Sequence, residues 1–474
     1  MNHDKNMTDF IGNSIIQGGK RMRKFLVRAL SVTLAMMITL CSSVVMAGAI
    51  SYPNEVKTKS KSILMVNMDS WQTVFEQEAD TRRYPASTTK IMTFIVAYEN
   101  IVDIDNTKVE IKESIIEQLN NTGSSMANLG AHVGEKMSVK DLLYSMMVPS
   151  GNDAALMLAD YVGGGNVEKF VKMMNDKAEE LGCKDTHFAN PDGLHDDNHY
   201  TTARDMYIIT KYALTLPDFD TISSATEYTC AGDDVTLVTT NYLIDRNRGG
   251  EYYYMYAKGI KTGTTDEAGR CLVTTATADG YSYLLVLLGA PYKEGEYEEY
   301  DTFTDAADLF RWALTSLELQ TIKTSKTPVI EQKVKLAWGK DSVMLVPEKD
   351  LNAVVPKDIN TENIVVETDL DNSEEPLEAP LSPDQPVGKA TVYYRVSADA
   401  EKQKIATVNL VPSEQIDRSG ILVVLDVMGT IFQSYWFLIV IGLMILILII
   451  YVIAAKIHRR RVAKRRKVKR YRNF

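Results

Sequence analysis

The sequence predicts an α+β protein in which an antiparallel sheet with helical layers is followed by a small all-β domain and one C-terminal transmembrane helix. Three observations in the 474-residue chain lead to this expectation. Strand-like runs occupy both ends of residues 51–320, with helix-like runs between them, which is typical of a sheet covered by helices. Short alternating runs fill residues 325–420. A twenty-residue uncharged apolar run then precedes a basic tail.

The first 49 residues have the layout of a secretory signal peptide. Several basic residues precede the apolar stretch 29–40, and residues 45–47 (VMA) resemble a cleavage site. Cleavage there would start the mature chain near residue 50, and an uncleaved anchor is the alternative. The segment before the apolar stretch is long for a signal peptide, so we also consider Met22 as the true start of translation.

Residues 50–322 are assigned to one domain, whose elements follow from periodicity. The expected strands are 62–68, 73–76, 271–277 and 281–288, and the expected helices are 90–99, 139–147, 153–161 and 304–317. The segment 90–99 is apolar nearly all round, which indicates a buried helix. Asp279-Gly280 between the last two strands is a strong hairpin signal.

Residues 325–420 are expected to form the small β-rich domain, serving as a stalk or as an interaction module. Its expected strands are 334–337, 342–346, 364–367, 391–396 and 405–410. Residues 369–386 are acidic and contain prolines, so we expect an exposed loop there.

The C-terminal segment 435–455 is predicted to span a membrane. An uncharged helix of twenty residues covers roughly 30 Å, the thickness of the hydrocarbon core. Tyr435 and Trp436 would lie at one interface, and the basic tail 456–474 would lie at the other. The positive-inside rule places this tail in the cytoplasm and the body of the protein outside the cell membrane.

The distribution of charge excludes some partners. The net charge is −10 overall, but the first 50 residues carry +4 and the last 19 carry +11, which leaves about −25 on the body. An acidic body argues against nucleic acid as a partner, because phosphate binding needs a basic face. The basic tail is explained by membrane topology.

Cysteine and histidine usage argues against a disulfide framework and a metal site. Cys41 would leave with the signal peptide, and the other three allow one bridge or three free thiols. His195 and His199 are four apart in a polar loop, and no His-Glu-x-x-His sequence is present, which disfavours a zinc peptidase. We therefore expect no metal and no cofactor.

The first candidate motif is Ser87-Thr88-Thr89-Lys90, preceded by Pro85. If a helix begins here, Ser87 and Lys90 share one face. A lysine desolvated by the apolar segment that follows could accept the proton of the serine and activate it as a nucleophile. The alternative is an ordinary capping serine with a solvated lysine, because Ser-x-x-Lys alone is common.

Two further motifs follow in the chain. Residues 150–152 (SGN) fall in the break between two helices, where a serine can relay a proton and an asparagine can hold an amide. Residues 261–265 (KTGTT) precede the predicted hairpin, where Gly263 on an edge strand would let a substrate backbone approach closely. Each motif alone is also compatible with an ordinary turn or an exposed strand end.

The three motifs occur together and in order, and they resemble the signature of penicillin-binding proteins and class A β-lactamases. The chain resembles the low-molecular-weight penicillin-binding proteins, which are serine D-alanyl-D-alanine carboxypeptidases. The similarity extends to 84–93, 139–164, 190–194, 199–206 and 258–273. Ser-Gly-Asn in place of Ser-Asp-Asn favours the carboxypeptidases over the β-lactamases.

The resemblance implies a role for each matching residue. Ser87 would be the acylated nucleophile, Lys90 the general base and Ser150 the residue that passes a proton to the leaving D-alanine. Asn152, Lys261, Thr262, Gly263, Thr264 and Thr265 would bind the substrate. Among these, Lys261 would support the site electrostatically and Thr262 and Thr265 would contact a carboxylate. The N–H groups of Ser87 and Thr264 would form the oxyanion hole.

The implied reaction removes the terminal D-alanine of peptidoglycan stem peptides, and β-lactam antibiotics would inhibit it. The alternatives are a β-lactamase, a D,D-endopeptidase or a catalytically silent wall-binding protein. One departure concerns the strand end 288–290 (LGA), after which the family often has an arginine. Lys293 is the only basic residue nearby in the sequence.

Overall fold

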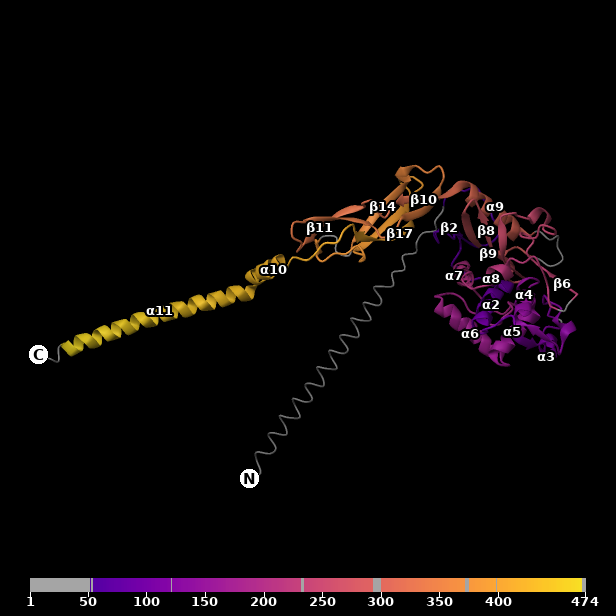
Figure 1. The fold of residues 1–474 in the computed structure, drawn as a ribbon, viewed down its shortest axis with the longest axis horizontal. Helices are drawn as coiled ribbons and strands as arrows, with labels where there is room; N and C mark the ends of the chain where they lie inside the picture. The colour runs from indigo at the N-terminus through magenta and orange to yellow at the C-terminus, as the bar shows by residue number, and fades with distance from the viewer. Residues whose placement is uncertain are drawn as a thin grey trace, which may run out of the picture. The chain divides into compact units, whose positions relative to one another are not determined.

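The computed structural model describes residues 52, 54–120, 122–231, 234–292, 300–370, 375–397 and 399–470. The predicted signal region and Lys293 lie outside the described residues. Figure 1 shows the course of the chain from the sheet and helices through the β-rich segment to the long C-terminal helix.

The sheet of the first part has five antiparallel strands in the order β2-β1-β9-β8-β7. Their bounds are Ser62–Asn67 (β1), Thr73–Gln77 (β2), Ala257–Thr265 (β7), Gly269–Ala278 (β8) and Tyr281–Ala290 (β9). The N-terminal β1 therefore pairs with β9 from the far end of this part. The predicted hairpin is present, with β8 and β9 joined at Asp279-Gly280.

Alternate side chains of the sheet enter two separate cores. Leu64 of β1 and Val286 of β9 belong to the core that includes the helix α2 (Lys90–Glu99). Their neighbours Met65 and Leu287 belong to the core that includes α9 (Asp301–Ser316). Because successive strand residues point to opposite faces, strands covered on both faces contain nearly continuous apolar runs.

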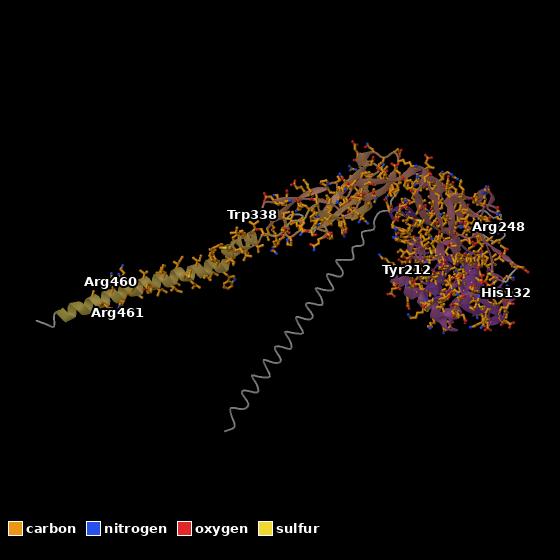
Figure 2. All side chains as sticks on the ribbon, in the orientation of Figure 1. His132, Tyr212, Arg248, Trp338, Arg460 and Arg461 are labelled. Atoms are coloured by element: carbon orange, nitrogen blue, oxygen red, sulfur yellow. The ribbon has the colours of Figure 1, made fainter. Side chains whose placement is uncertain are left out.

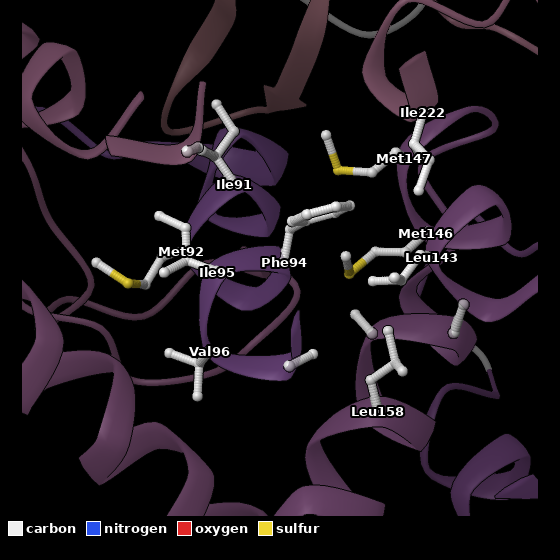
Figure 3. Close-up of a cluster of buried hydrophobic side chains, with 14 of the residues drawn as sticks. Ile91, Met92, Phe94, Ile95, Val96, Leu143, Met146, Met147, Leu158 and Ile222 are labelled. Carbon is white, nitrogen blue, oxygen red and sulfur yellow. The ribbon is translucent and has the colours of Figure 1, made fainter. Parts of the chain in front are cut away.

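The helical layer over the first core is built around α2. Phe94 is fully buried and extends from α2 toward methionines of α4, as Figure 3 shows. The helices of this part are α3 (Glu113–Gln118), α4 (Val139–Met147), α5 (Asn152–Gly163), α6 (Val167–Glu180), α7 (Ala203–Ala213) and α8 (Phe219–Ser223). Two short antiparallel strand pairs lie among them: β3 (Lys108–Glu110) with β4 (Lys136–Ser138), and β5 (Glu227–Thr229) with β6 (Thr236–Val238).

The β-rich segment contains a six-stranded sheet in the order β14-β16-β17-β12-β11-β15 and the separate pair β10-β13. The strands are β10 (Leu317–Lys323), β11 (Ile330–Lys335), β12 (Ser342–Pro347), β13 (Leu351–Pro356), β14 (Ile364–Leu370), β15 (Leu377–Glu378), β16 (Gly388–Tyr394) and β17 (Gln403–Pro412). The predicted strand 334–337 is corrected: β11 ends at Lys335, because Leu336 adopts a left-handed φ of 62°. β10, β13 and β15 were not predicted from the sequence.

The C-terminal end is helical. α10 (Gly420–Gln433) was not predicted, and α11 (Tyr435–Arg470) continues well beyond the expected end at residue 455. Residues 435–463 of α11 are long and apolar enough to cross a membrane. Figure 2 places Arg460 and Arg461 on the distal part of this helix. The basic tail is thus an extension of the apolar helix as far as residue 470.

The structure confirms the predicted fold class of antiparallel sheet, helical layers, all-β segment and single apolar C-terminal helix. It also refines the start of the first helix. Residues Ala86–Thr89 (η1) form a 3-10 turn, and the α-helix begins at Lys90.

Candidate active site

The turn η1 and the helix α2 together place Ser87 and Lys90. Ala86 has a φ of 46°, a left-handed conformation that an L-residue rarely adopts. Gly193 lies against this turn so closely that an added Cβ would be 2.0 Å from the carbonyl oxygen of Ala86. The turn before Ser87 is therefore held in an unusual conformation by a neighbouring backbone that only glycine can supply.

Lys90 is the centre of the polar network. Its Nζ donates to Ser87 Oγ at 3.0 Å, to Asn152 Oδ1 at 2.7 Å and to the backbone oxygen of Asp192 at 2.6 Å. The residue is fully buried. Burial disfavours the charged amine and lowers the pKa of Lys90 to about 8, although the charges of Asp192 and Asp153 act in the opposite direction.

The second motif lies in the break between α4 and α5. Ser150 is buried and has a left-handed φ of 67°, and Asn152 is the first residue of α5. The buried carboxylate of Asp153 accepts backbone N–H groups from Ala127 and Leu129. This carboxylate fixes the loop before α4 against the start of α5, beside the asparagine that accepts from Lys90.

The third motif lies on β7, which runs beside η1. A Cβ on Gly263 would be 2.9 Å from the nitrogen of Ser87. The glycine is therefore needed for the approach of β7 to the chain's own nucleophile turn, whereas the sequence analysis considered only the approach of a substrate. Lys261 is fully buried, and burial together with the positive charge of Lys90 lowers the pKa of Lys261 well below its ordinary value.

The three threonines of this strand have different surroundings. Thr262 shares a hydrogen bond of 2.5 Å with the hydroxyl of Thr240. Thr264 lines the cleft described below. Thr265 accepts the backbone N–H of Ala268 within the turn between β7 and β8 and is not among the residues that line the cleft. A carboxylate contact by Thr265 stays a prediction.

These residues border one cleft of about 390 Å³, which we call the Ser87 cleft. The predicted residues that line it are Ser87, Ser150, Thr262, Gly263 and Thr264. Lys90, Asn152 and Lys261 are buried behind them. Segments that are far apart in the sequence therefore meet at one site, with the serine hydroxyl at its wall and two lysines of lowered pKa beneath it.

Several residues of the Ser87 cleft were not predicted from the sequence, among them Thr240, Arg248, Arg270 and Tyr300. Arg270 lies within the similar stretch 258–273, but only the tertiary structure brings these residues to the site. Asp192 was also missed, although the stretch 190–194 was noted. Its backbone oxygen accepts from Lys90, so the main chain of that stretch contributes to the network.

The histidines and cysteines make separate contacts. His199 is buried, with Nε2 at 2.7 Å from the hydroxyl of Thr89 and Nδ1 accepting the N–H of Ala189. Burial lowers the pKa of His199 to about 4, so the ring is neutral at physiological pH. Cys183, Cys230 and Cys271 are free thiols, so the alternative of one bridge does not apply to these described residues.

The arrangement defines a site for acyl transfer by a serine. A hydroxyl lies within hydrogen-bond distance of a buried lysine whose lowered pKa makes the neutral amine accessible near physiological pH. The start of α2 lies directly after this hydroxyl, where the helix dipole favours negative charge on the serine oxygen or on an oxyanion.

Comparisons with known proteins agree with this class of site. Residues 49–292 match the family model for D-alanyl-D-alanine carboxypeptidase, and residues 318–418 match the model for the C-terminal domain of penicillin-binding protein 5. A D-alanyl-D-alanine carboxypeptidase DacA from Haemophilus influenzae is 31% identical over 370 residues, covering 76% of this chain and 86% of the relative. The carboxypeptidase DacF from Bacillus subtilis is 32% identical over 240 residues, which cover 50% of this chain and 59% of that protein.

Solved structures give the same result. Penicillin-binding protein 5 from Haemophilus influenzae superimposes with a TM-score of 0.61 at 27% identity, covering 78% of this chain and all of that one. The chain belongs to the D-alanyl-D-alanine carboxypeptidase family of serine peptidases. This assignment confirms the class of enzyme predicted from the three motifs and does not favour the alternatives.

Proposed function

We propose that the Ser87 cleft removes the terminal D-alanine from peptidoglycan stem peptides through an ester formed on Ser87. The observation that carries this proposal is the 3.0 Å hydrogen bond from Lys90 Nζ to Ser87 Oγ, made by a fully buried lysine. A lysine with a pKa of about 8 can accept a proton from the serine and return it within the same site.

The proposed reaction assigns one step to each of these groups. Lys90 takes the proton of Ser87 as the serine oxygen attacks the D-Ala–D-Ala carbonyl. The N–H groups of Ser87 and Thr264 stabilise the oxyanion. Ser150 passes a proton to the leaving amine, and water then hydrolyses the ester to regenerate the hydroxyl.

Substrate binding uses the walls of the Ser87 cleft. The Oδ1 of Asn152 is engaged by Lys90, which leaves its NH₂ group to donate to a carbonyl of the acyl chain. Gly263 and Thr264 border the cleft on β7, where an extended peptide can lie beside the strand. β-Lactams carry a strained amide and a carboxylate, so we expect them to acylate Ser87 as well.

The reaction is proposed to occur outside the cell membrane. The apolar helix α11 would span the bilayer once, and its basic end, which carries Arg460 and Arg461, would lie in the cytoplasm. Protease treatment of intact spheroplasts tests this: a C-terminal tag should be protected while the catalytic part is degraded. Degradation of the tag would contradict the orientation.

Labelling with a fluorescent penicillin tests the nucleophile. Wild-type protein and Ser87→Ala are compared with Ser114→Ala, which changes an exposed serine of α3 outside the site. We expect labelling of the wild type and of Ser114→Ala only. Release of D-alanine from a peptide ending in D-Ala-D-Ala should follow the same pattern.

The two measurements separate the parts of the proposal. Labelling of a folded Ser87→Ala protein would refute the role of Ser87. Labelling that depends on Ser87 without release of D-alanine would refute the proposed substrate but retain the nucleophile. The circular dichroism of each variant shows whether it is folded.

A further inference from the structure

Arg270 is a positively charged residue of the Ser87 cleft to which the motifs assign no role. It lies on β8, directly opposite Thr264 of β7 in the ladder. The residue is only 7% exposed, and it lines the cleft together with Ser87. Side chains directly opposite each other on neighbouring strands have Cβ atoms about 5 Å apart. Arg270 is therefore beside the strand that would carry the substrate.

The guanidinium of Arg270 is held in place by aromatic rings. Its central carbon lies 3.8 Å from the ring centre of Tyr300 and 4.9 Å from that of Tyr292. Stacking of this kind orients an arginine without neutralising its charge. Neither ring offers the two adjacent oxygen acceptors that the parallel N–H groups of a guanidinium prefer.

The hydrogen-bonding capacity of Arg270 is not used within the part of the chain that the structure describes. Its Nε is buried and has no hydrogen-bond partner. Arg248, the other arginine of the cleft (Figure 2), differs: its Nε donates to Asp245 at 2.6 Å, and its charge is therefore balanced. An unpaired buried donor on a charged group costs free energy unless a ligand satisfies it.

The other cations near Ser87 cannot replace this charge. Burial lowers the pKa of both Lys90 and Lys261, and Lys90 already donates to three protein oxygens. An arginine remains charged at every physiological pH. Within the described residues, Arg270 is thus the permanent cation of the cleft that has no carboxylate partner.

Strand pairing explains how Arg270 reaches this position. On its other side, Arg270 pairs with Ala290, the last residue of β9. The register shifts between Arg270 and Leu272, and such a bulge redirects a side chain at the end of a strand. The sequence lacks an arginine directly after residues 288–290, and the neighbouring strand supplies a guanidinium at the same end of the sheet.

We propose that Arg270 binds the terminal carboxylate of the substrate's leaving D-alanine and thereby makes the enzyme prefer free peptide ends to amidated or cross-linked ones. A carboxylate offers two oxygens that match the guanidinium fork. The fit requires a substrate that ends one residue beyond the bond attacked by Ser87. This inference rests on the proposed reaction at Ser87.

The test compares Arg270→Gln and Arg270→Lys with the wild type on two peptides that end in D-Ala-D-Ala. One peptide has a free terminal carboxylate, and the other has a terminal carboxamide. Arg311→Gln is the matched control, because Arg311 is an exposed residue of α9 that pairs with Asp308. The full-length protein in detergent is used throughout, and kcat/KM is measured for both peptides.

We expect Arg270→Gln to lower kcat/KM for the free acid by about 10- to 100-fold, the range for loss of a charged hydrogen-bonded pair. Activity on the amide should change little, so the acid-to-amide ratio falls. Arg270→Lys should retain part of the ratio, because it keeps the charge but loses the fork. An equal loss on both peptides would show a structural role and overturn the proposal.

A second measurement keeps the proposal testable if the wild type releases no D-alanine. The rate of Ser87 acylation is compared for a penicillin and its methyl ester, which differ only in the carboxylate. Arg270→Gln should slow acylation by the acid and leave the ester unchanged. An unchanged ratio would refute the role of Arg270, whereas absence of D-alanine release alone would refute the proposed reaction.

Discussion

The pKa of Lys90 makes a quantitative prediction about the pH dependence of acylation. At a pKa of about 8 rather than 10.5, the neutral amine at neutral pH is about 300 times more abundant, since each pKa unit is a factor of ten. About a tenth of the enzyme then holds the free base near pH 7. At pH values below the pKa of Lys90, the acylation rate should rise about tenfold per pH unit. It should level off above about pH 9.

The proposed perturbation is Asp192→Asn. The charge of Asp192 is the larger of the two carboxylate effects that raise the pKa of Lys90 against burial. Asparagine can still accept the N–H of Leu194, which Asp192 Oδ1 accepts at 3.0 Å. Removing the charge should lower the midpoint by about one pH unit, the low end of the effect of a nearby opposite charge.

The assay is the second-order rate of acylation by a fluorescent penicillin, measured by stopped flow from about pH 6 to pH 10. The pH dependence of this rate reports the pKa values of groups in the free enzyme. Asp176→Asn is the control, because Asp176 is an exposed residue of α6 paired with Lys172. A wild-type midpoint near 10, or a midpoint that rises in Asp192→Asn, would refute Lys90 as the base in this environment.

Four further predictions concern acylation, stability and anchoring. Gly193→Ala should reduce acylation strongly in a labelling assay, because its Cβ would collide with the backbone of Ala86; normal labelling would contradict the tight packing. Phe94→Ala should lower the free energy of unfolding by about 3 to 5 kcal/mol in urea titrations, since the side chain is fully buried. Relative to Lys90→Met, the wild type should gain stability as pH rises from about 8 to 10.5, because the folded state binds fewer protons than the unfolded state in that window. Removal of residues 420–474 should move the protein from the membrane fraction to the soluble fraction, and retention in membranes would argue for a second anchor.

Local patterns in the sequence were sufficient for several elements. The expected helix 90–99 coincides with α2, and Asp279-Gly280 joins β8 and β9. These elements could be predicted because helix periodicity and turn chemistry depend on neighbouring residues. β10 and β13 were missed; they pair with each other across a connection that contains β11 and β12.

The residues of the site were also predicted only in part. The serine, the lysine and the two later motifs were identified because each has a recognisable spacing. The 3-10 turn at Ala86–Thr89 and the contacts of Gly193 and Gly263 with that turn depend on segments packed against it. Arg270 lies within the similar stretch 258–273, but its sequence position does not show that its side chain lines the cleft.

The sequence by itself determined the class of fold, the apolar C-terminal helix and the motifs of a serine acyl-transfer enzyme. These features are encoded in residue types at short spacings along one segment. Only the tertiary structure decided the pKa of Lys90, the partners of Asn152 and Asp192, and the place of Arg270 between Thr264 and Ala290. Burial, charge and strand register arise from contacts between distant segments, so their effects on chemistry appear only when the chain is folded.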